Sequence, residues 1–123
     1  MLLLHVGFRF SLHSASLSVH VDPVEQTVDA GNAAIFNCSV AGHPIEKLAW
    51  YKNGEPLAND TRILIHPPNK LVVRDVRRHD QGMYQCFIGN NRETVQGAAQ
   101  LSLGGQSQVH TLRVPRTPKK SSP

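Results

Sequence analysis

Several features that define other classes of protein are absent from this sequence of 123 residues. It has no run of 18 or more apolar residues, so we expect no direct membrane insertion of this chain. It also has no glycine-rich phosphate loop, since Gly104 and Gly105 precede a polar tail instead of opening a helix. No segment shows a helical period of helix length. The sequence therefore argues against a membrane helix and against a nucleotide-binding α/β protein.

Metal-binding and catalytic patterns are equally scarce. The chain has only two cysteines, and its seven histidines lack metal-ligand spacing. One arrangement, Asp80 next to His79 with Cys86 nearby, could suggest a nucleophilic triad, but the pattern described below gives Asp80 and Cys86 structural roles. We predict no catalytic residue, no metal and no cofactor.

The formal charge of +4 does not point to a nucleic-acid partner, because of where the charges lie. Residues 19–104 contain eight basic and nine acidic residues, which leaves that segment at about −1. The excess of basic residues belongs to the flanks. A nucleic-acid interface needs a basic stripe with aromatic or helical readers, and we predict none here.

Composition divides the chain into three parts. Residues 1–18 form a leader that is either a weak signal-peptide candidate, interrupted by His5, Arg9 and His13, or disordered. Residues 19–104 have the pattern of a folded domain. Residues 105–123 form a basic tail rich in Ser and Pro, with too few apolar residues to offset the entropy of folding. We predict one domain, with a disordered tail.

The middle segment reads as short strands separated by turns. In "AAIFNCSV", apolar residues occupy every second position from Ala34 to Val40, which is the strand period. "KLAWYKNGEPL" repeats the pattern and turns at Asn53-Gly54. The segments "RILI", "KLVVRDV", "MYQCFI" and "AAQLSL" follow. Repeated short strands with frequent turns predict an all-β sandwich.

One constellation of residues specifies the kind of sandwich. Cys38, Trp50 and Cys86 occur in that order, and Tyr84 lies two residues before the second cysteine. This arrangement resembles an immunoglobulin domain. Because the segment between Trp50 and Leu71 is short, the resemblance is to the intermediate (I-set) type.

The resemblance implies a β-sandwich of two antiparallel sheets, with one inter-sheet disulfide between Cys38 and Cys86 covered by Trp50. It also implies a chain corner in "DQGMY", where Asp80 and Gly82 precede Tyr84 and the tyrosine hydroxyl bonds back to the backbone. In immunoglobulin domains an acid at the position of Asp80 commonly pairs with an arginine. Arg62 in "TRILI" is the residue expected to do so.

A disulfide implies an oxidising compartment, and two glycosylation sequons agree with an extracellular location. Asn59-Asp60-Thr61 lies in a loop-like stretch, which suits glycosylation. Asn37-Cys38-Ser39 lies within a predicted strand, and a glycan there would project from the outer face of its sheet. Tyr51, Phe87 and Val72 have the outward parity; they are either ordinary mixed surface residues or part of a contact patch.

The stretches "VRRHDQGMYQCFIGNN" and "GAAQLSLGG" narrow the resemblance further. They are similar to a constant-type immunoglobulin domain of the Down syndrome cell adhesion molecule (Dscam) family. That resemblance implies a cell-surface receptor of many immunoglobulin and fibronectin modules, acting in homophilic adhesion, axon guidance and arthropod immune recognition. We interpret this chain as a fragment of such a protein, extracellular and non-enzymatic.

The expected partners are other immunoglobulin-domain proteins, including the chain itself. The predicted loop contacts are Asn90, Asn91, Arg92 and Glu93. Two alternatives remain open: an intracellular structural I-set domain of a muscle-type protein, which would have free thiols and no glycan, and a secreted single-domain immune factor. The location is the cell surface in a full-length parent, or secretion if the chain is complete.

Overall fold

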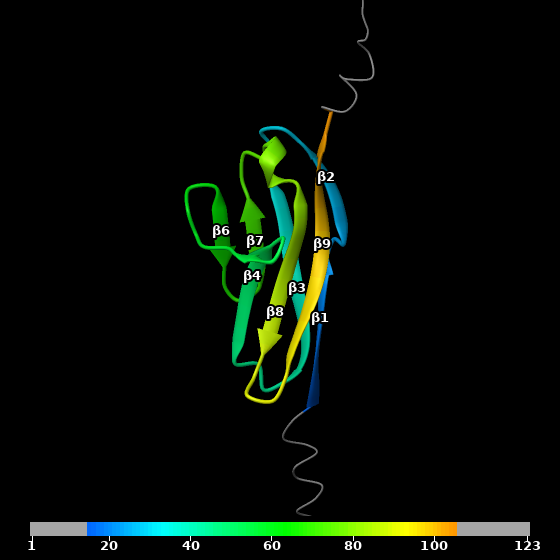
Figure 1. Cartoon of the computed structure of the whole chain (residues 1–123), viewed down its shortest axis with the longest axis vertical. Coiled ribbons are helices and arrows are strands. Elements are labelled where there is room, and N and C mark those ends of the chain that lie inside the picture. The colour runs from blue at the N-terminus through cyan, green and yellow to red at the C-terminus, as the bar shows by residue number, and fades with distance from the viewer. Residues whose placement is uncertain (1–14, 106–123) are drawn as a thin grey trace, which may run out of the picture.

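The computed structural model describes residues 15–105, which form nine strands and one short 3₁₀ turn (Figure 1). Their bounds in chain order are β1 Ala15–Asp22, β2 Glu25–Asp29, β3 Ala34–His43, β4 Lys47–Lys52, β5 Glu55–Pro56, β6 Ile63–His66, β7 Lys70–Val73, η1 Arg78–Asp80, β8 Gly82–Gly89 and β9 Thr94–Gly104. The predicted short strands are all present. The last strand begins four residues before "AAQLSL", because Val95 and Gly97 continue the inward-facing row of residues.

The strands form two sheets packed face to face (Figure 1). One has four strands in the order β1-β3-β7-β6, and the other has five in the order β2-β9-β8-β4-β5. The prediction of an all-β sandwich of two sheets is confirmed. The pairings are antiparallel with one exception, since β2 runs parallel to β9.

That exception involves the first two strands, which lie in different sheets. β1 pairs with β3 in one sheet, and β2 pairs with β9 in the other. Pro23 lies between them and has no backbone N–H to extend a ladder. β1 begins at Ala15, so the expected boundary between residues 18 and 19 falls inside this strand. Leu17 and Val21 face the core and explain the earlier start.

The core lies between the sheets and is built by the period-two pattern of the strands. Phe36, Leu71, Tyr84 and Leu101 are fully buried within it. Cys38 and Cys86 form the predicted disulfide across the sandwich, with a Cα–Cα distance of 6.3 Å. Trp50 is the cross-strand partner of Cys86 and is almost completely buried. The disulfide and Trp50 therefore lie next to each other within the core between the two sheets.

Gly82 opens β8 because no other residue fits the corner there. Its φ of +145° is rarely adopted by residues with a side chain. A Cβ at this position would lie 2.7 Å from Asn53 Nδ2. The Asn53 amide oxygen accepts a hydrogen bond from Met83 N at 2.9 Å, so the asparagine is held against the glycine. This contact joins the turn after β4 to the start of β8.

Candidate binding surfaces

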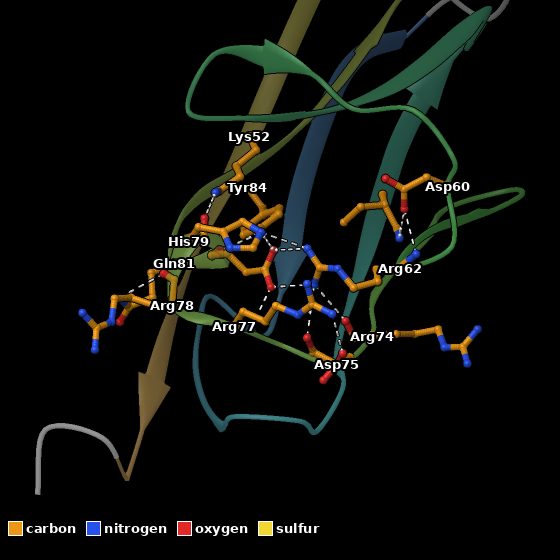
Figure 2. Close-up of polar contacts among 12 residues, drawn as sticks. Lys52, Asp60, Arg62, Arg74, Asp75, Arg77, Arg78, His79, Gln81 and Tyr84 are labelled. Atoms are coloured by element: carbon orange, nitrogen blue, oxygen red, sulfur yellow. Dashed lines mark hydrogen bonds and ion pairs between the residues drawn. The ribbon is translucent and has the colours of Figure 1, made fainter. Parts of the chain in front are cut away.

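The predicted corner is a network of polar groups around Arg62 (Figure 2), whose ion-pair partner is Asp80. Arg62 Nη1 lies 2.8 Å from Asp80 Oδ2, and Nη2 lies 3.1 Å from Oδ1, so the pair is bidentate. Arg62 also donates to the backbone carbonyls of Arg74 and Asp75. One guanidinium thus fixes the whole turn between β7 and β8.

The Asp80 carboxylate remains charged although its side chain is only 5% exposed. Burial raises its pKa, but hydrogen bonds from the Arg62 guanidinium and from Arg77 N oppose this and hold the pKa below its usual range. Tyr84 Oη donates to the Asp80 carbonyl at 2.6 Å, which is the predicted bond back to the backbone. Burial raises the pKa of Tyr84, so its hydroxyl stays a donor.

The arrangement of Asp80, His79 and Cys86 is not a nucleophilic triad. Cys86 is bonded to Cys38, so it has no free thiol. His79 Nε2 is 3.7 Å from Asp80 Oδ1, and its side chain is largely exposed. Both Asp80 oxygens are already engaged by Arg62. The site therefore stabilises the fold and provides no activated nucleophile.

The turn between β8 and β9 contains the four predicted contact residues, which differ in their exposure to solvent. Asn91 and Arg92 are exposed. Asn90 is buried: its amide donates to Pro44 O, and its oxygen accepts from the backbone N–H groups of Arg92 and Glu93. The prediction of Asn90 as a surface contact is wrong, because these hydrogen bonds use its side chain to organise the turn.

Glu93 is partly buried, and its carboxylate accepts from Leu17 N at 3.1 Å. This bond ties the turn to the first strand. A polar cavity of about 280 Å³ lies beside it, lined by Ala15, Ser16, His43, Asn90, Arg92 and Glu93. Of the four predicted contacts, Asn91 and Arg92 are the two whose side chains the structure leaves most accessible.

Replacing Asn90 with alanine is expected to destabilise the domain by about 1–3 kcal/mol, because two backbone N–H groups and one carbonyl lose their partner. Asn91→Ala, one residue along on the exposed side of the same turn, is the matched control and should change stability by less than about 0.5 kcal/mol. Urea denaturation of both variants measures the difference. Equal effects would contradict the structural role of Asn90.

The two glycosylation sequons differ in position, since Asn37 lies in β3 of the four-stranded sheet and Asn59 lies in the loop between β5 and β6. Asn37 is exposed in β3 and points away from the core, as predicted. Asn59 is exposed too, and its amide oxygen accepts from Ile65 N at 2.7 Å, in the edge strand β6. A glycan on either residue would therefore stand on or beside this sheet.

Metal and membrane features are absent from residues 15–105. In this range no group of three or more His, Cys, Asp or Glu side chains could hold a metal ion. Nor does the same range include a helix long and apolar enough to cross a bilayer. The tail at 105–123 and the leader to residue 14 lie outside the described residues, apart from Gly105.

The disulfide across two sheets, the tryptophan beside it and the tyrosine at the corner define an immunoglobulin-like domain. A family model for the immunoglobulin I-set domain matches residues 17–103. The chain therefore belongs to the immunoglobulin I-set family.

The chain is similar to parts of several larger proteins. The chain is 37% identical over 100 residues to the cell adhesion molecule Dscam1 of Drosophila melanogaster. It is 30% identical over 92 residues to vascular endothelial growth factor receptor 1 of Gallus gallus. These matches cover 81% and 74% of this chain, but only 5% and 7% of the relatives. The resemblance to a Dscam immunoglobulin domain is confirmed.

Solved structures agree with the sequence comparison. The eight N-terminal immunoglobulin domains of Dscam isoform 1.30.30 match with a TM-score of 0.67 and 40% identity, over 76% of this chain and 13% of that one. The four N-terminal domains of Dscam1 isoform 1.9 match with a TM-score of 0.66 and 38% identity, over 74% and 22%. This chain corresponds to one module of such multidomain proteins.

Proposed function

We propose that this chain is an extracellular recognition module of a Dscam-like cell-surface receptor, which acts by binding other immunoglobulin domains. The observation that supports this most directly is the buried disulfide between Cys38 and Cys86, since such bonds persist in oxidising compartments. The similarity to a cell adhesion molecule gives the class of activity. The exposed sequon at Asn59 agrees with passage through the secretory pathway.

The module acts by contact and without catalysis. Its polar network at Asp80 is saturated by Arg62, Arg77 and the chain corner. Partners include other immunoglobulin-domain proteins and a second copy of the chain. In a full-length receptor the consequences would be homophilic adhesion, axon guidance or arthropod immune recognition, and this module would either choose the partner or set the spacing between modules that do.

The intracellular alternative, a structural domain of a muscle-type protein, makes opposite chemical predictions. It requires two free thiols and no sugar, because cytosolic reductants keep cysteines reduced. The fully buried sulfurs of Cys38 and Cys86 allow this test only after unfolding. The secreted immune factor shares the disulfide and the glycan, and differs in that the part of the leader before β1 must act as a signal and be removed.

The experiment is the intact mass of the protein recovered from an expressing animal cell, before and after glycosidase and after alkylation of the unfolded chain. We expect a disulfide, and a glycan at Asn59 that Asn59→Gln removes. Asn37→Gln is measured alongside to assign any second glycan. Two alkylated cysteines and no sugar would overturn the proposed function.

A further inference from the structure

The turn between β4 and β5 contains two residues that can react with each other. Asn53 is followed by Gly54, and no other asparagine of the sequence precedes a glycine. Glycine has no side chain to shield its backbone nitrogen, so this nitrogen can approach the amide carbon of the preceding asparagine. The dipeptide that predicts the turn is therefore also a candidate for spontaneous deamidation.

This reaction needs only water as a co-reactant. The Gly54 nitrogen attacks Cγ of Asn53, the bond between Cγ and Nδ2 breaks, and Nδ2 leaves as ammonia together with the proton of Gly54 N. The product is a five-membered succinimide. Water then opens the ring at either of its two carbonyls, which leaves aspartate or isoaspartate at position 53.

The start of β8 holds and activates the asparagine side chain. Asn53 Oδ1 accepts a hydrogen bond from Met83 N at 2.9 Å, and Asn53 N donates to Met83 O at 2.8 Å. The first of these bonds draws electron density toward Oδ1, as the donors of an oxyanion hole do, and so makes Cγ more open to attack. The carbon that is attacked is thus fixed in place and activated.

The attacking nitrogen is restrained instead. Gly54 N donates to Gln85 Oε1 at 3.0 Å, so a hydrogen bond holds the proton that this nitrogen must lose. Asn53 and Gly54 have φ values of +50° and +84°, and both signs are those of the type I′ turn that joins a two-residue hairpin. Turning Gly54 N toward Cγ would give up both the turn conformation and the bond to Gln85.

We propose that Asn53 is a deamidation site and that Gln85 slows the reaction in the folded domain. Gln85 is 31 positions from Gly54 and reaches the turn because β4 pairs with β8. Opening of the turn alone is then enough to start the reaction. An isoaspartate adds one carbon to the main chain, so the two-residue turn loses its register with Met83 and separates from the start of β8.

The test follows Asn53 in the oxidised whole chain by peptide mass mapping during incubation at mildly alkaline pH. Gln85→Ala should raise the rate of deamidation about fivefold, the factor that one net hydrogen bond supplies. Gln85→Glu keeps an acceptor oxygen, and its charge disfavours loss of the Gly54 proton, so its rate should not exceed that of the parent. The matched control is Gln96→Ala, at an exposed glutamine that pairs with Phe87 on the neighbouring strand β9, and it should react like the parent.

The reduced chain in urea shows the reaction without the fold. There Asn53 should react faster than in the folded parent, and faster than Asn91, which precedes an arginine. Equal rates for the unfolded and folded parent would overturn the inference. So would a Gln85→Ala rate equal to that of the parent, or an equal rise in Gln96→Ala. Circular dichroism of each variant establishes that the sandwich is intact, so that general unfolding does not cause the faster rate.

Discussion

Replacing both Cys38 and Cys86 with alanine is expected to lower the free energy of unfolding by about 4 kcal/mol. The bond closes a loop between residues 48 positions apart, and in the chain-entropy model a loop of that length restricts the unfolded chain by this amount. Small domains have total stabilities of roughly 5–15 kcal/mol. The variant should therefore lose a large part of its folded population at 37 °C, as measured by urea denaturation.

A second pair of variants separates the bond from its packing. In the double variant Cys38→Val with Cys86→Val, the valines fill the space that alanines leave. The difference in the free energy of unfolding between the two double variants therefore measures the cost of the cavity. Both pairs should remain less stable than the oxidised parent. A valine pair as stable as the parent would show that the sulfurs act only by filling the core beside Trp50.

Asp80→Asn is expected to destabilise the domain by about 3 kcal/mol at neutral pH. It keeps the shape of the side chain but leaves the Arg62 guanidinium, only 20% exposed, without its counter-charge. The matched control is Asp75→Asn, in an ion pair with Arg77 in which both side chains are 55% exposed. That change should cost less than about 1 kcal/mol, since exposed pairs contribute little. Equal losses from the two variants would contradict the network.

The buried Asp80 carboxylate also predicts that the stability difference between the parent and Asp80→Asn depends on pH. The pKa of Asp80 is lowered by folding, so its stabilising charge is fully present above the unfolded value of about 3.9. The contribution is lost as the pH falls through the lower folded value. The stability difference between the parent and Asp80→Asn should thus be constant from pH 7 to about pH 5 and shrink below pH 4. A stability difference that grows as the pH falls below 4 would contradict the lowered pKa of Asp80.

Much of the fold could be predicted from the sequence because the core residues sit at period-two positions. The positions of Cys38, Trp50 and Cys86 indicate which strand faces point inward, and Tyr84 indicates the chain corner before β8. The partnership of Arg62 and Asp80 followed from resemblance to a family, and the structure forms that ion pair.

Other features depend on partners that are far apart in the chain. Alternation shows which face of a strand is buried but not which strand lies beside it, so the parallel pairing of β2 with β9 was not predicted. Asn90 reads as an exposed turn residue until Pro44, 46 positions away, supplies its partner. The edge-to-face contact between Tyr51 and Phe87 depends on the register of β4 and β8, which brings residues from two distant segments together.

The parallel contact between β2 and β9 also has a mechanical consequence. The start of β1 and the end of β9 lie at opposite ends of the sandwich, as the blue and orange ends of the ribbon show (Figure 1). A pulling force on the two ends runs along the strands, so it loads the pairing of β1 with β3 and then the five residue pairs of the parallel β2–β9 ladder in shear. Shearing a ladder loads its hydrogen bonds all at once, whereas peeling breaks them one by one. The geometry therefore favours resistance of this domain to a force applied at its two ends.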